Sequence, residues 1–151
     1  MRITVLNGPN LNLLGVREPE LYGRETLADV ETRVREVGQE LGVEIDFAQE
    51  NCEGALIDRI HAMRGSSDGA LINAGAYSHT SLAIRDALTA VQVPFIEVHL
   101  SNIYAREPER RHSMLAGSAV GVVCGLGALG YELALRGLVA HVSTHPRPAC
   151  G

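Results

Sequence analysis

The sequence predicts an α/β protein in which helices cover both faces of one five-stranded parallel sheet. Three observations predict it. Five short apolar runs alternate with longer segments whose apolar residues recur at spacings of three and four. Glycine or proline stands beside most of these segments, as at the ends of strands and helices. The apolar share of 46% is enough for a packed core, and with no tryptophan that core must consist mainly of aliphatic side chains.

The first part of the chain predicts a strand, a helix and a second strand. Residues 2–7 form the first apolar run. Thr26 is suited to begin the helix and Gly42 to end it. In residues 43–47 apolar and polar side chains alternate, which is typical of an edge strand. The apolar stripe of the helix consists of Leu27, Val30, Val34, Val37 and Leu41.

The remaining elements follow the same alternation. Ser78 is expected to cap the third helix, and Pro94 follows its end. A charged segment at 101–113 has room for a short helix. The expected ranges are a helix at 53–64, a strand at 69–73, a helix at 80–91, strands at 94–100 and 119–124, and a largely apolar helix from 126 to about 142.

Five strands in this pattern favour the flavodoxin-like order 2-1-3-4-5. In that order strands 1, 3 and 4 are neighbours, and ligands bind at the carboxyl ends of the strands, where the order reverses between strands 1 and 3. The site is therefore expected where the loops after strands 1, 3 and 4 meet.

Composition excludes several classes of protein. At 151 residues the chain predicts a single catalytic domain over 1–143 and a flexible tail over 144–151. The net charge of −5 argues against nucleic-acid binding, and no apolar run is long enough for a membrane span. The N-terminus does not resemble a signal peptide, so a cytoplasmic location is expected. Cys52, Cys124 and Cys150 fit no zinc spacing and are expected to be reduced.

All thirteen basic residues are arginine. Without lysine the chain cannot form a Schiff base, use a lysine base or build a Walker-type phosphate loop. Any positive charge in the site must come from guanidinium groups, which do not exchange protons near neutral pH.

The loop at 8–24 is unusually long for a connection in a compact domain. It carries Tyr22 together with Arg17 and Arg24. An isolated phenol is a poor base at pH 7, but nearby guanidinium charge stabilises the phenolate. Tyr22 is therefore a candidate general base on a closing flap; the alternative is an aromatic side chain that only holds the loop in place.

Other polar side chains stand after the predicted strands. Asn10 could donate to a developing oxyanion, Asn73 could face a ligand, and His99 could serve as a general acid at neutral pH. Each also has a structural alternative: Asn10 as a turn residue, Asn73 as a satisfied buried amide, and His99 as a satisfied core histidine. His79 and Asp86 are expected on one face of the third helix, where capping and an ion pair are the alternatives. Glu97 needs an arginine or histidine partner if buried, and the backbone at Ser101 could bind a carboxylate.

Residues 125–130 match the pattern G-x-G-x-x-G. The match lies after the last predicted strand, and no acidic residue follows about 20 positions later as a dinucleotide site requires. Close packing of helix on strand is the better interpretation.

Five motifs in this order resemble those of the type II 3-dehydroquinate dehydratases, over about residues 2–138. They are NGPNLNLLG at 7–15, REPELYG at 17–23, NAGAYSHTS at 73–81, IRDA at 84–87 and EVHLSN at 97–102. The resemblance implies reversible anti elimination of water from 3-dehydroquinate through an enolate, in the shikimate pathway. It implies no metal or organic cofactor, and a homo-oligomer, a dodecamer that is built from trimers.

The resemblance also implies roles for individual residues. Tyr22 would be the base, supported by Arg17 and Arg106, and His99 would be the acid, oriented by Glu97. Asn10 would hold a water or the enolate oxygen. The turn at Leu100 and Ser101 would bind the substrate carboxylate, and Asp86 would reach a neighbouring subunit's site. The remaining substrate-binding residues would be Asn73, Gly75, His79 and Arg110.

A second hypothesis from another class is a flavodoxin-like receiver or small-ligand regulatory domain without catalysis. A receiver requires an aspartate after strand 1 or strand 3 and a lysine further along the chain. The chain has Asn7 and Asn73 at those positions and no lysine, so this hypothesis is weak.

Overall fold

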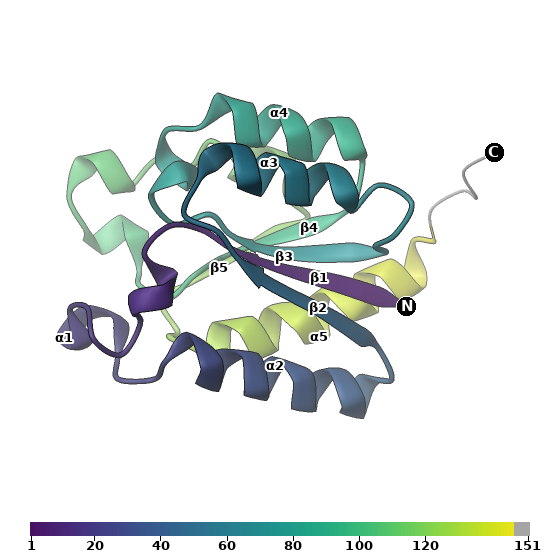
Figure 1. The fold of residues 1–151 in the computed structure, drawn as a ribbon, viewed down its shortest axis with the longest axis horizontal. Helices are drawn as coiled ribbons and strands as arrows, with labels where there is room; N and C mark the ends of the chain where they lie inside the picture. The colour runs from purple at the N-terminus through teal and green to yellow at the C-terminus, as the bar shows by residue number, and fades with distance from the viewer. Residues whose placement is uncertain (147–151) are drawn as a thin grey trace.

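The computed structural model describes residues 1–146 and contains one parallel sheet of five strands in the order β2-β1-β3-β4-β5 (Figure 1). This confirms the predicted flavodoxin-like order. The strands are β1 (Arg2–Asn7), β2 (Glu44–Gln49), β3 (Gly69–Asn73), β4 (Phe95–His99) and β5 (Gly121–Cys124).

Helices cover both faces of the sheet. On one face lie α2 (Leu27–Leu41) and α5 (Leu129–Thr144), which contact each other; on the other lie α3 (Glu53–Ala62) and α4 (Leu82–Val91), which also contact each other. Short helical turns fill the connections: α1 (Pro19–Tyr22), η1 (Leu11–Leu13), η2 (Gly75–His79), η3 (Ile103–Ala105), η4 (Pro108–Arg110) and η5 (Ala116–Ser118).

Successive side chains along each strand point to opposite faces of the sheet, and this produces two hydrophobic cores. In β1, Ile3 and Val5 pack under α2 and α5, whereas Leu6 packs under α3 and α4. These three side chains are almost fully buried. Because the central strands are covered on both faces, they read as nearly continuous apolar runs.

The ends of α2 are set by local sequence. The Thr26 side chain accepts a hydrogen bond from the Asp29 backbone N–H, and the Asp29 carboxylate accepts one from the Thr26 backbone N–H. Gly42 ends the helix with φ 67°, a left-handed conformation that glycine adopts at little cost. Both ends agree with the prediction.

Two predicted helix starts were wrong. Ser81, not Ser78, caps α4: its hydroxyl accepts from the backbone N–H of Ile84, while Ser78 and His79 belong to the 3-10 turn η2. His79 therefore does not share a helix face with Asp86. Helix α5 begins at Leu129 rather than at 126, because positive φ angles at Gly125 and Gly127 are incompatible with a helix.

The other predictions differ at their ends or lie outside the described residues. Strand β2 runs on to Gln49 and α5 to Thr144, whereas β5 begins two residues later than expected, at Gly121. The predicted tail at 144–151 lies outside the described residues from position 147, as does Cys150. Within residues 1–146 no helix has the length and apolarity required to cross a membrane.

The loops after β1 and β3 approach each other closely where the strand order reverses. A Cβ atom on Gly8 would lie 2.4 Å from the Ala74 carbonyl oxygen, a distance that real Cβ contacts do not reach. Gly75 has φ 59°, and a Cβ there would lie 3.1 Å from the Pro9 carbonyl oxygen. Glycine at these two positions lets the loops meet and form the floor of the site.

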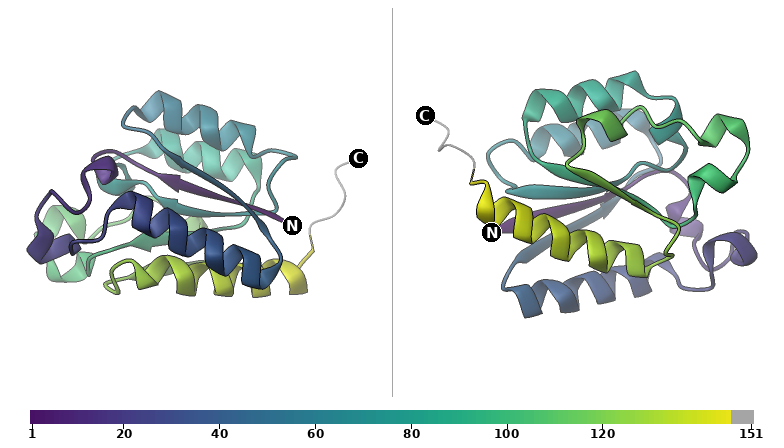
Figure 2. Two further views of the ribbon diagram at one scale, coloured as in Figure 1. Left: turned by 60° about the horizontal axis from the view of Figure 1, so that its bottom comes forward. Right: turned by 180° about the vertical axis from the view of Figure 1, so that it is seen from behind.

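At this end of the molecule the loop that follows β1 also meets the segment between β4 and β5. Both views in Figure 2 show them together, the first in purple and the second in green. Residues far apart in the sequence can therefore line one pocket.

We predict that Gly8→Ala lowers the free energy of unfolding by about 1–3 kcal/mol, because the added methyl group overlaps backbone rather than a movable side chain. Gly117→Ala is the control, since nothing lies within 4 Å of a Cβ at Gly117. Urea unfolding of both variants measures the difference. Equal stability of Gly8→Ala and the unmodified protein would contradict the close approach.

Candidate active site

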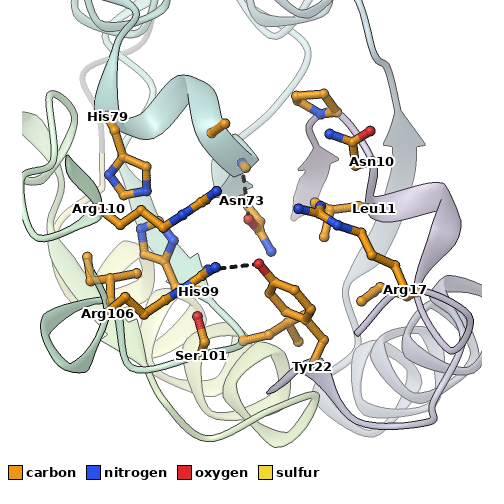
Figure 3. Close-up of a pocket in the computed structure, with 16 residues that line it drawn as sticks. Asn10, Leu11, Arg17, Tyr22, Asn73, His79, His99, Ser101, Arg106 and Arg110 are labelled. Atoms are coloured by element: carbon orange, nitrogen blue, oxygen red, sulfur yellow. Dashed lines mark hydrogen bonds between the residues drawn. The ribbon is translucent and has the colours of Figure 1, made fainter. Parts of the chain in front are cut away.

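One pocket lies at the carboxyl ends of β1, β3 and β4 and encloses about 720 Å³, including space open to solvent (Figure 3). Its size suits a small organic ligand. The lining residues are Pro9, Asn10, Leu11, Leu14, Arg17, Tyr22, Asn73, Gly75, Ala76, His79, His99, Leu100, Ser101, Ile103, Arg106 and Arg110.

Tyr22 enters the pocket from the long loop and lies between two guanidinium groups. Arg106 donates a hydrogen bond from Nη1 to the Tyr22 hydroxyl at 2.7 Å. The guanidinium carbons of Arg17 and Arg106 each lie 5.4 Å from the centroid of the Tyr22 ring. Two positively charged groups therefore lie beside the Tyr22 ring, and one of them donates to its hydroxyl.

Short helical turns give the long loop at 8–24 its shape. Asn10 has φ 68° and begins η1, a left-handed conformation that asparagine tolerates better than most residues. Its side chain makes no capping hydrogen bond, and it lines the pocket. Pro19 stands at the start of α1, and Tyr22 ends that turn. The long loop at 8–24 therefore presents Asn10, Arg17 and Tyr22 to the pocket.

His99 lines the pocket from the end of β4, with a buried carboxylate behind it. Glu97 Oε1 lies 2.6 Å from His99 Nε2, and the Glu97 side chain is 0% exposed. Ser113 Oγ lies 2.7 Å and 2.8 Å from the two oxygens of that carboxylate. Because a carboxylate can only accept, Nε2 carries the proton in this contact, and Glu97 fixes the orientation of the imidazole ring.

Asn73 contributes a buried amide at the end of β3. Its Nδ2 donates to the Tyr131 hydroxyl at 2.8 Å, and its Oδ1 accepts from the Gly75 backbone N–H at 3.3 Å. Tyr131 in turn donates to Asn7 Oδ1 at 2.7 Å. Three polar side chains thus form a bonded chain beneath the pocket.

His79 lies above His99, with the two ring centroids 5.9 Å apart and the rings stacked. Its Nδ1 lies 2.7 Å from the His112 carbonyl oxygen, which can only accept, so Nδ1 carries a proton. Burial lowers the pKa of His79, and the nearby His99 and Arg110 act in the same direction. At neutral pH His79 is therefore uncharged and carries a lone pair on Nε2.

The pocket is strongly positive. Arg17, Arg106 and Arg110 line it, and none of the other described residues that line it is acidic. Glu107 lies outside the pocket and pairs with Arg110 at 2.5 Å and Arg106 at 3.7 Å. Such a pocket favours an anionic ligand.

The structure brings together most of the residues that the sequence singled out. Eleven of the thirteen predicted site residues line the pocket; the other two are Glu97, which lies behind His99, and Asp86. Asp86 is exposed on α4, 3.4 Å from Arg85, outside the pocket of its own chain. The roles of all thirteen remain predictions.

Sequence reasoning missed Ser113 and Tyr131. Ser113 stands in a charged segment with no periodicity that would mark it as buried. Tyr131 had one signal, since it is the only tyrosine in an apolar helix. Of the three glycines in the G-x-G-x-x-G match, Gly130 lies against the sheet: a Cβ there would lie 3.4 Å from Val123 Cγ1.

No cluster of three or more His, Cys, Asp or Glu side chains that could hold a metal ion occurs within residues 1–146. Of the cysteines in that range, Cys52 and Cys124 are both free.

The fold and the pocket define a flavodoxin-like α/β protein with an arginine-lined pocket at the carboxyl ends of its strands. Comparison with known proteins makes the assignment more specific. The family model described as "Dehydroquinase class II" matches residues 1–139, and the chain belongs to this family. The regulatory-domain hypothesis is therefore set aside.

Curated relatives agree with the family. The chain is 66% identical to the 3-dehydroquinate dehydratase of Gemmatimonas aurantiaca, over 92% of this chain and 91% of that protein. It is 62% identical to the protein of the same name from Methylococcus capsulatus, over 89% and 91% of the two chains.

Solved structures share the fold. The type II dehydroquinase from Propionibacterium acnes superposes with a TM-score of 0.88 at 45% identity, covering 92% of this chain and 96% of that one. The type II dehydroquinase from Butyrivibrio crossotus also gives a TM-score of 0.88, at 42% identity over 90% and 95%.

We predict that His79 makes the protein less stable in weak acid. Its pKa is lowered in the folded protein, so the unfolded chain binds more protons at this residue. The stability from neutral His79 is fully present above pH about 6.5 and is lost as pH falls through the lower folded pKa. His79→Gln should therefore lose less unfolding free energy than the unmodified protein between pH 7.5 and 5.

Urea unfolding across this range measures the effect, with His61→Gln as the control because His61 is exposed on α3. The same pH slope in His79→Gln and the unmodified protein would refute the prediction.

Proposed function

We propose that this protein is a 3-dehydroquinate dehydratase, a hydro-lyase that converts 3-dehydroquinate to 3-dehydroshikimate and water in the shikimate pathway. The observation that carries the proposal is the Arg106–Tyr22 hydrogen bond at 2.7 Å in the pocket that His99 also lines. The pocket thus contains a candidate base, Tyr22, and a candidate acid, His99, on different sides. Membership of the dehydroquinase family supports it.

In the first step Tyr22, as the phenolate, removes a proton from the carbon next to the ketone. The C–H bond breaks, and its electron pair moves to the carbonyl oxygen to give an enolate. Arg106 and Arg17 stabilise the phenolate before the step. Asn10 holds a water molecule or the enolate oxygen itself, because amide N–H groups stabilise developing negative charge.

In the second step the enolate re-forms the ketone, and the C–O bond to the departing hydroxyl breaks. His99 gives its pocket-side proton to that oxygen, which leaves as water. Glu97, held by Ser113, keeps the ring in place and opposes its charge. Tyr22 then returns its proton to solvent and His99 regains one, so the enzyme is unchanged.

The remaining lining residues bind the substrate. The backbone at Leu100 and Ser101, directly after β4, takes the carboxylate, and the three pocket arginines complement its charge. Asn73, Gly75, His79 and Arg110 bind the ring hydroxyls. Neutral His79 suits this role because it offers a lone pair to a hydroxyl proton.

The proposed reaction uses no metal and no organic cofactor, since Tyr22 and His99 supply both proton transfers. A route through a lysine Schiff base is closed to this chain, because it has no lysine.

We propose further that the chain works in the cytoplasm as a homo-oligomer, a dodecamer. Exposed apolar side chains on one helix support self-association: Leu129 and Leu133 on α5 are each 44% exposed. The position of Asp86 supports it too, because an exposed carboxylate outside its own pocket is free to reach the site of a neighbouring subunit.

The direct test mixes the purified protein with 3-dehydroquinate and follows the ultraviolet absorbance of the conjugated enone. The proposal expects the absorbance to rise, at a rate that a chelator does not change. No enone at high protein concentration would refute the activity, and inhibition by the chelator would refute the cofactor-free mechanism.

We predict that Tyr22→Phe and His99→Ala each lower kcat by about 100- to 10,000-fold, the usual loss when a general acid or base is removed. Circular dichroism and thermal unfolding check that both variants remain folded. Tyr104→Phe is the matched control for the phenol, because Tyr104 is 57% exposed and does not line the pocket. Full activity in Tyr22→Phe or His99→Ala would show that its role is misassigned.

A further inference from the structure

A buried phenol lies beneath the pocket and has no place in the proposed reaction. Tyr131, on the first turn of α5, is 0% exposed. Its hydroxyl joins the two asparagines that end β1 and β3, donating to Asn7 Oδ1 at 2.7 Å and accepting from Asn73 Nδ2 at 2.8 Å. A buried hydroxyl with both partners satisfied holds those partners in one orientation.

Backbone groups at the two ends fix the direction of this chain of hydrogen bonds. The Ala48 carbonyl oxygen can only accept, and it lies 3.1 Å from Asn7 Nδ2. Asn7 must therefore turn its oxygen to Tyr131, which gives it the single phenolic proton. The Tyr131 oxygen can then only accept from Asn73, whose NH₂ group must face the phenol.

The contact at the Asn73 end of the chain independently gives the same direction. The Gly75 backbone N–H can only donate, and it lies 3.3 Å from Asn73 Oδ1. Burial raises the pKa of the Tyr131 phenol, so the hydroxyl keeps its proton at neutral pH. One hydrogen of the Asn73 amide is used on Tyr131, and the other is left for the pocket that Asn73 lines. Figure 3 shows the Asn73 side chain reaching towards the space between Tyr22 and His99.

We propose that Tyr131 is a positioning residue: through the Asn7–Tyr131–Asn73 chain it fixes the Asn73 amide so that an N–H, not the carbonyl, faces the substrate. This inference rests on the proposed function, in which Asn73 binds a hydroxyl oxygen of 3-dehydroquinate. Without the phenol, the 3.3 Å hydrogen bond from the Gly75 backbone N–H is the remaining restraint on the amide within this chain, and a half-turn rotation costs less. Rotation would point a carbonyl oxygen at a ligand oxygen that is placed to accept a hydrogen bond.

The kinetic test compares Tyr131→Phe, Asn73→Ala and the double variant with 3-dehydroquinate. Loss of one oriented hydrogen bond should raise KM about tenfold in each single variant. It should leave kcat within about threefold, because the bond is made in both the ground state and the transition state. The double variant should show the KM of Asn73→Ala and no further rise, since Tyr131 acts through Asn73.

Tyr77→Phe is the matched control. Its hydroxyl donates to the Asn51 backbone carbonyl at 3.3 Å, and Tyr77 does not line the pocket. The KM of the Tyr77→Phe variant should equal that of the unmodified protein. If Tyr131→Phe lowers the melting temperature but leaves KM unchanged, Tyr131 is only structural and the inference is overturned. The inference would also be overturned if the rise in KM of the double variant equalled the product of the rises in the two single variants.

A second measurement does not depend on activity. Crystal structures of unliganded Tyr131→Phe and the unmodified protein should differ at Asn73: the variant should lose the Gly75 contact, and the unmodified protein should keep it. An unchanged Asn73 side chain would overturn the inference even in an active enzyme. An inactive unmodified protein with the expected rotation would overturn the proposed function and leave the positioning of Asn73 supported.

Discussion

Parallel pairing of β1 with both β2 and β3 is the constraint on which the rest of the structure depends. Because all strands point the same way, β1, β3 and β4 end at one edge of the sheet. After β1 the chain continues to α2 on one face of the sheet, whereas after β3 it continues to α4 on the other face. The loops after β1 and β3 therefore diverge above the ends of their strands. That separation provides room for the pocket, and Gly8 lets the two loops meet beneath it.

The chemistry of the site follows from a shortage of titratable groups. With no lysine, the fixed positive charge comes only from arginine, which cannot itself move protons at neutral pH. Besides arginine, the titratable side chains that line the pocket are Tyr22, His99 and His79, and burial lowers the pKa of His79. Two arginines act on Tyr22, whereas the buried carboxylate of Glu97 acts on His99. In the proposed mechanism these opposite environments suit Tyr22 to accept a proton and His99 to give one.

Sequence alone predicted the parts that depend on local patterns. The capping residues fixed the start of α2, apolar periodicity identified each strand and helix, and the number of strands favoured the order of the sheet. Tyr22 was noticed because its loop is too long to be only a connection. Arg106 was expected near Tyr22 because both follow strands that end at the same edge of the sheet, but no spacing rule fixes a contact between residues 84 positions apart.

The features that sequence did not predict depend on geometry between distant segments. Ser81 rather than Ser78 caps α4 because the backbone turns through η2 first, and no propensity separates two serines three positions apart. Ser113 reaches Glu97 across 16 residues of irregular chain. Tyr131 meets Asn7 across 124 residues, and only the completed sheet places α5 beneath the switch point.

We propose that Arg106 serves catalysis through Tyr22. A double-mutant cycle on kcat distinguishes this role from an independent one, with Arg106→Met, Tyr22→Phe and the double variant turning over 3-dehydroquinate. Arg106→Met should slow the enzyme by at least about tenfold when Tyr22 is present and have little further effect when Tyr22 is already phenylalanine. If the fall in kcat of the double variant equalled the product of the falls in the two single variants, Arg106 would act independently of Tyr22.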